Sequence, residues 1–127
     1  MISSITIINT GTTMPYAKIE TNLKLGKLKE QKLLKAASVF FATLLEKSEE
    51  HVMVAVSLNI PIIFGKNSSP AAYVELKSMA IKEERCTDLS KEICCFLNQH
   101  LDILPNRIYI EFSTINGKMF GCNNKTF

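Results

Sequence analysis

Few residues in this chain could carry chemistry. It has four cysteines, Cys86, Cys94, Cys95 and Cys122. Their spacing matches neither a disulfide scaffold nor the Cys-x-x-Cys pattern of a metal or redox site, so we expect free thiols in a reducing compartment. The two histidines, His51 and His100, are too far apart in the pattern to indicate a metal site. We therefore expect neither a metal ion nor another cofactor.

A Met-Pro pair, Met14 and Pro15, stands where the patterned part of the sequence begins. The residues up to Met14, MISSITIINTGTTM, carry no positive charge and only a short apolar run, so they do not match a secretory signal peptide. No later segment approaches the roughly 18 apolar residues of a membrane span. We therefore expect no association with a membrane.

The composition narrows the class of protein further. The chain has 127 residues, of which 46% are apolar and 21% charged, and this predicts one globular domain with a single core. The formal net charge of +3 is spread over mixtures of lysine and glutamate such as KLKEQK (27–32) and IKEER (81–85). Nucleic-acid binding requires a basic patch, so we expect no nucleic-acid partner.

The hydrophobic pattern predicts two strand–helix–strand units. The predicted strands alternate or are β-branched, and the predicted helices carry apolar residues at intervals of three and four. The first unit comprises a strand at 15–21, a helix within 25–48 and a strand at 51–58; the second comprises a strand at 73–81, a helix at 87–101 and a strand at 107–113. Asn116-Gly117 then predicts a hairpin, with a short return strand that ends near Phe120.

These elements predict an α+β fold in which two βαβ units form a four-stranded mixed sheet with two helices on one face. Residues 15–127 should form this domain, and residues 1–14 should be an N-terminal extension. The strand at 51–58 is apolar on both sides and should be buried on both faces. Other subunits would then cover the open face of the sheet, which predicts an oligomer.

Four stretches together resemble the macrophage migration inhibitory factor and D-dopachrome tautomerase family. They are MPYAKIETN (14–22), FGKNSSPAAYVELKSMA (64–80), LPNRIYIEF (104–112) and FGCNNKTF (120–127). The resemblance implies the tautomerase fold and a homotrimer, with sheets that line a central channel and active sites at the subunit boundaries. It also implies leaderless secretion, so we expect a cytoplasmic protein that can be secreted without a signal peptide.

The resemblance implies that Pro15 is the catalytic base once Met14 is removed. A proline nitrogen inside a chain is a tertiary amide and is not basic. A terminal proline nitrogen is an amine with a pKa near ~8, which an apolar pocket and a nearby cation would lower. Such a base could move the proton α to a carbonyl of a phenylpyruvate- or dopachrome-like substrate, which is keto–enol tautomerisation.

The resemblance also implies the substrate-binding residues. Lys47 matches a lysine that holds an anionic substrate group, and Met79 lies where the family uses a backbone N–H. Tyr109 matches a tyrosine that a neighbouring subunit contributes. Without the resemblance, Lys47 would be read as a solvated lysine and Tyr109 as a strand residue half in the core. Further pocket walls are expected from Tyr16, Phe120 and Phe127.

Three positions depart from the family pattern. Glu111 replaces an asparagine; its carboxylate would repel an anionic substrate and, near Pro15, would raise the pKa of the amine. Cys122 replaces a common tryptophan, and His51 replaces a tyrosine. The pocket should therefore be less aromatic, which leaves the choice between phenylpyruvate-like and dopachrome-like substrates open.

The extension decides between two functional hypotheses. If residues 1–14 remain attached, Pro15 is an internal amide and the base is lost. We favour natural translation from Met14, with the upstream residues as an artefact, because the resemblance begins there. The first hypothesis is then a tautomerase with a free Pro15. The alternative is a secreted, cytokine-like interaction protein that binds a cell-surface receptor, with weak or no catalysis.

Overall fold

The computed structural model describes residues 14–127. Residues 1–13 of the predicted extension lie outside the described residues. Within the described range, none of the helices is both long and apolar enough to span a bilayer.

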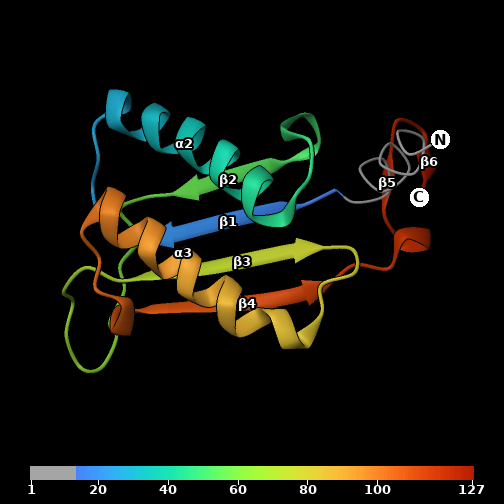
Figure 1. The fold of residues 1–127 in the computed structure, drawn as a ribbon. Coiled ribbons are helices and arrows are strands. Elements are labelled where there is room, and N and C mark those ends of the chain that lie inside the picture. The colour runs from blue at the N-terminus through green and yellow to red at the C-terminus, as the bar shows by residue number, and fades with distance from the viewer. Residues whose placement is uncertain (1–13) are drawn as a thin grey trace.

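A four-stranded mixed sheet and two helices form the body of the structure (Figure 1). The strands are β1 (Tyr16–Thr21), β2 (Met53–Ser57), β3 (Ala72–Ser78) and β4 (Ile108–Thr114), and the helices are α2 (Lys27–Leu45) and α3 (Cys86–Leu101). The strand order is β2-β1-β3-β4. β1 is parallel to β2, β3 is parallel to β4, and the central pair β1 and β3 is antiparallel. Both helices cover the same face, so the predicted fold of two βαβ units is confirmed.

Short elements connect and extend this body. Four 3-10 turns are η1 (Glu49–His51), η2 (Glu83–Arg85), η3 (Pro105–Arg107) and η4 (Gly117–Met119), and a small C-terminal hairpin consists of β5 (Gly121–Cys122) and β6 (Lys125–Thr126). This hairpin lies beyond the end of the sheet at which β1 begins and β3 finishes (Figure 1).

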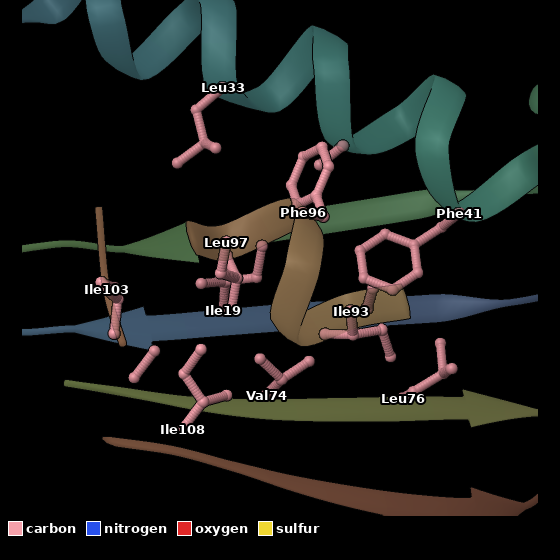
Figure 2. Close-up of a cluster of buried hydrophobic side chains, with 13 residues drawn as sticks. Ile19, Leu33, Phe41, Val74, Leu76, Ile93, Phe96, Leu97, Ile103 and Ile108 are labelled. Atoms are coloured by element: carbon pink, nitrogen blue, oxygen red, sulfur yellow. The ribbon is translucent and has the colours of Figure 1, made fainter. Parts of the chain in front are cut away.

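The hydrophobic core lies between the sheet and the two helices (Figure 2). Strands β1 and β3 turn every second side chain toward the helices, because side chains alternate along a strand. The fully buried side chains include Ile19, Phe41, Val74, Leu76, Ile93, Leu97 and Ile103. One buried polar group, the Thr21 hydroxyl, donates a hydrogen bond of 2.6 Å to the Ala71 carbonyl and so ties the first unit to the second.

The strand predicted at 51–58 is only partly buried within a single chain, so its predicted burial on both faces stays a prediction. β2 is an edge strand of the sheet. Val54 and Val56 pack toward the core, whereas Met53 on the opposite side is 65% exposed. A run of apolar residues does not distinguish a central strand from an edge strand whose outer face carries methionine and alanine. The predicted oligomer would cover this exposed side with another copy of the chain, and it stays a prediction.

The hairpin predicted at Asn116-Gly117 is wrong, and so is a return strand that ends near Phe120. Asn116 has a φ of −81° and begins η4, where its side chain accepts a hydrogen bond from the Lys118 N–H. The hairpin turn lies instead at Asn123-Asn124, which have φ values of 54° and 68°. The packing around Gly117 is tight, because a Cβ atom there would lie 3.1 Å from the Met79 sulfur and 3.3 Å from the Phe127 carbonyl oxygen.

The open face of the sheet is polar. It carries lysine, glutamate and tyrosine side chains of β1, β3 and β4: Tyr16, Lys18, Glu20, Tyr73, Glu75, Lys77, Tyr109 and Glu111. The Tyr73 hydroxyl donates a hydrogen bond of 2.5 Å to Glu111 Oε1. This bond to a carboxylate raises the pKa of Tyr73, because it stabilises the protonated phenol.

The core should be sensitive to the loss of Phe41. Phe41→Ala should lower the free energy of unfolding by about 3–5 kcal/mol, because the change leaves a cavity between α2 and the sheet. Denaturant titration measures the effect. Val39, which is 53% exposed on the same helix, provides the control: Val39→Ala should stay within about 0.5 kcal/mol of the unmodified protein. Equal losses for the two variants would contradict the assigned core.

The Tyr73–Glu111 hydrogen bond should be visible in a tyrosinate absorbance titration. Glu111→Gln should lower the pKa of Tyr73 toward its usual value near ~10, because the charged acceptor is lost. The stabilisation is present below that usual pKa and disappears as the pH rises through the raised pKa of Tyr73. Tyr73→Phe identifies the transition among the three tyrosines. An unchanged titration in Glu111→Gln would show that the bond does not form.

Candidate active site

Pro15 lies directly before β1, at the end of the sheet where that strand begins. Its side chain is fully buried, and its carbonyl accepts a hydrogen bond of 3.0 Å from the Met53 N–H. Tyr16 pairs with Lys77, so Pro15 is placed beside the end of the antiparallel strand β3. The first residue of the domain is thus held by the strands on both sides of it.

A pocket of about 260 Å³ opens at Pro15. Four of the residues predicted for the site line it, namely Pro15, Tyr16, His51 and Phe120. Met14, Glu50, Val52, Met53, Gly121 and Cys122 complete the lining. The walls are largely apolar, and they come from the start of β1, from η1 with the start of β2, and from the C-terminal hairpin.

Phe127 does not line this pocket but supports its wall. The Phe127 N–H donates hydrogen bonds to the carbonyls of Gly117 and Phe120, and the Phe127 ring centroid lies 5.9 Å from that of Phe120. The chain terminus is thereby folded back onto η4. Phe127 therefore packs behind Phe120 and is not itself the pocket wall that was predicted.

Lys47 and Met79 line a second cavity, of about 550 Å³. It lies at the same end of the sheet as Pro15, because Met79 directly follows β3 and Lys47 follows the end of α2. Two further cations, Lys82 and Arg85, also line it, whereas the acidic lining comes from Glu46. Three cations against one acid favour an anionic occupant.

Sequence reasoning missed Lys82 and Arg85, because the IKEER run looks like an ordinary solvated surface. The structure places them around the 3-10 turn η2, with Lys82 as its N-cap and Arg85 as its last residue. Lys82 has an extended backbone and Arg85 a helical one, so the regular spacing of a helix or strand does not relate them. No signal in the sequence could therefore have identified the pair.

Tyr109 and Glu111 are not brought to Pro15 within one chain. They pair with Tyr73 and Glu75 on the open face of the sheet, and neither lines the two cavities described above. Tyr109 is 63% exposed, and its ring centroid lies 4.7 Å from that of Phe64. A single chain thus assembles only part of the predicted site.

Arg107 fixes the loop that carries Phe64. Its guanidinium donates hydrogen bonds of 2.8–3.3 Å to the carbonyls of Phe64, Asn67, Ser69 and Pro70. It also lies 5.1 Å from the centroid of the Phe64 ring, in a cation–π contact. The aromatic neighbour of Tyr109 is therefore held in a defined position.

The site shows no arrangement suited to a metal ion. Between residues 14 and 127, no three histidine, cysteine, aspartate or glutamate side chains gather closely enough to bind one. The four cysteines are unpaired in this range, and Cys122 is exposed beside the Pro15 pocket. The two cavities at this end of the sheet thus combine Pro15 and largely apolar walls in one with three cations in the other.

Comparisons with known proteins identify relatives of this chain. The profile of the family "Macrophage migration inhibitory factor (MIF)" matches residues 14–127. The macrophage migration inhibitory factor homolog of Trichinella spiralis is 32% identical over 115 residues, which cover 90% of this chain and 100% of that protein. The D-dopachrome decarboxylase of Mus musculus is 26% identical over 113 residues, 85% of this chain and 92% of that protein.

A solved structure extends the likeness to the fold. The crystal structure of the macrophage migration inhibitory factor homologue from Prochlorococcus marinus superposes with a TM-score of 0.80 at 32% identity, and it covers 88% of this chain and 98% of that one. The four-stranded mixed sheet with its two helices is therefore the fold of those proteins. This chain belongs to the macrophage migration inhibitory factor family.

Proposed function

We propose that this protein is a keto–enol tautomerase for phenylpyruvate- or dopachrome-like substrates, with Pro15 as the catalytic base when it is the free amino terminus. The place of Pro15 carries the proposal. It lies at an apolar pocket whose lining includes Met14. Removal of Met14 would therefore free both the Pro15 nitrogen and the space beside it.

The pocket would tune that nitrogen for proton transfer. A terminal amine has a pKa near ~8 in water. The apolar walls disfavour the charged ammonium form of Pro15, and the cations at the same end of the sheet disfavour it as well. Both effects would lower the pKa of Pro15 toward neutrality, where a general base is most effective, whereas the Glu50 carboxylate in the same lining would raise it.

The reaction needs only a proton shuttle. The Pro15 nitrogen takes the proton from the carbon α to the substrate carbonyl, and the C–H electron pair forms the C=C bond of an enolate. The ammonium then returns the proton to the enolate oxygen, which gives the enol. The Met79 N–H and Lys47 are the groups proposed to stabilise the negative oxygen while it develops.

The second cavity supports an acidic substrate. Lys47, Lys82 and Arg85 form its positive lining. A 2-oxo acid such as phenylpyruvate would place its carboxylate toward these cations and its ring against the Pro15 pocket, where Tyr16 and Phe120 form apolar walls. This arrangement uses both cavities for one substrate.

A homotrimer is part of the proposal, because Tyr109 and Glu111 lie on the open face and away from Pro15. They can contribute to a site only if they meet the Pro15 of another copy. β2 and β4 are the outer strands of the four-stranded sheet, so each offers an edge that another copy can contact.

A second candidate is a cytokine-like protein that is secreted without a signal peptide and binds a cell-surface receptor. The names of relatives favour it, since the proteins of Trichinella spiralis and Brugia malayi are both called macrophage migration inhibitory factor homologs. The two functions differ in what Pro15 contributes. A receptor-binding surface does not require a free amine, whereas the tautomerase does.

The central test compares two forms of the chain in a phenylpyruvate tautomerase assay. The form that begins at Pro15 should be active, whereas the form that retains residues 1–14 should lose about 10²- to 10⁴-fold of that activity, because its Pro15 nitrogen is an amide. Pro15→Gly in the short form should be similarly impaired with unchanged circular dichroism. Equal activity in the two forms would refute Pro15 as the base.

Subunit complementation tests whether the site is shared between chains. Short-form Pro15→Gly and short-form Tyr109→Ala should each be weakly active alone. After mixed refolding in equal amounts, roughly a quarter of the unmodified activity should return, because a quarter of the interfaces in randomly mixed trimers pair an intact Pro15 with an intact Tyr109. Light scattering provides the mass of the assembly. A monomer, or no regained activity in a mixed trimer, would contradict the shared site.

A further inference from the structure

A third cavity, of about 650 Å³, lies far from Pro15. It opens between the first turns of α2, the end of α3 and the segment that follows β1. Pro15 precedes β1 and this segment follows it, so the six residues of the strand, roughly 20 Å at 3.3 Å per residue, separate the two places. In Figure 1 the start of α2 and the end of α3 lie side by side at the end of the sheet that is farther from the C-terminal hairpin.

The floor of this cavity is aliphatic and belongs to the core. It is formed by Leu23, Leu25, Leu33, Ala36 and Leu101. Leu33 is 4% exposed, and the other four are partly buried and pack against the core cluster. Because core side chains hold these groups in place, the cavity does not need to form when a ligand arrives. Its floor offers an apolar surface without an aromatic ring.

The rim of the cavity carries positive charge. Lys29 and Lys32 are three residues apart on α2, so they lie on the same side of the helix. Neither belongs to an ion pair among the described residues. The acid in the lining is Asp102, and the lining is completed by Gln99 and His100. Two lysines against one aspartate favour an anion of low charge.

The His100 ring is held at the edge of the cavity. Its centroid lies 4.3 Å from that of Phe96, which is itself part of the core. The N-cap of α2 is Gly26, which has no capping side chain, so the positive end of the helix dipole adds to the charge of Lys29 nearby. Glu30 in the same turn carries the opposing charge but does not line the cavity. Positive groups thus lie along one side of an apolar floor.

This combination selects among ligand classes. A nucleotide would find no aromatic surface for its base in the aliphatic floor, and its several phosphate charges exceed two lysines. A flexible alkyl chain with one carboxylate matches both the floor and the rim. The geometry points to a second ligand site at this cavity, which binds a medium-chain fatty acid with its carboxylate at Lys29 and Lys32. The site does not depend on the proposed tautomerase activity.

Calorimetric titration of the full chain with decanoate tests the site. Decanoate should bind with a stoichiometry of one per chain, and 1-decanol should bind at least about tenfold more weakly, because it lacks the charge that the lysines recognise. The double variant Lys29→Glu/Lys32→Glu should also lose at least about tenfold in affinity. Ala36→Met, which places additional atoms over the floor, should weaken decanoate and 1-decanol alike.

Matched controls separate this site from others. Lys35→Glu/Lys91→Glu produces the same change in net charge on the two helices that border the cavity, and neither residue lines it. The affinity of this variant for decanoate should be unchanged. Lys47→Ala should also leave binding unchanged, because Lys47 lines the cavity near Pro15. Absent decanoate binding, equal binding of 1-decanol, equal losses in the two double variants, or a loss in Lys47→Ala would each overturn the proposal.

Discussion

The position of Pro15 depends on the hydrogen-bonded pairing of β1 with strands on both sides. β1 runs parallel to β2 and antiparallel to β3, and its inward side chains Ala17, Ile19 and Thr21 are completely buried. A shift of one residue would turn the charged Lys18 into the core, so the register is strongly specified. The residue before such a strand can move very little, which suits a catalytic base, because proton transfer requires a fixed geometry.

The antiparallel central pair also separates the two proposed sites, which lie at opposite ends of the strands. The start of β1 and the end of β3 lie together, which places Pro15 near Met79. α2 finishes at the end of the sheet where β1 begins, and it starts at the opposite end. Lys47 consequently follows α2 toward the proposed active site, whereas Lys29 and Lys32 lie at the remote cavity. α2 thus connects two groups of cations, one in its first turns at the remote cavity and one just beyond its last residue at the proposed active site.

Local patterns predicted the elements better than their surroundings. The helix at 87–101 was predicted because its apolar side chains recur every four residues, and α3 occupies Cys86–Leu101. The burial of the strand at 51–58 on both faces stays a prediction, because it depends on other copies of the chain, which no local pattern describes. The Asn116-Gly117 turn failed for a related reason: Met79 and Phe127 pack closely against Gly117, and its φ is not positive.

The sequence alone determined the periodicity of the two βαβ units, the absence of a cysteine pair at redox spacing, and the family resemblance that singles out Pro15, Lys47 and Met79. These follow from residue types and short spacings. Only the tertiary structure decided that Lys82 and Arg85 join Lys47 in one cavity, and that Tyr109 lies on the open face and away from Pro15. The physical reason is that such groupings arise from strand register and chain reversals, which bring together residues that no local pattern connects.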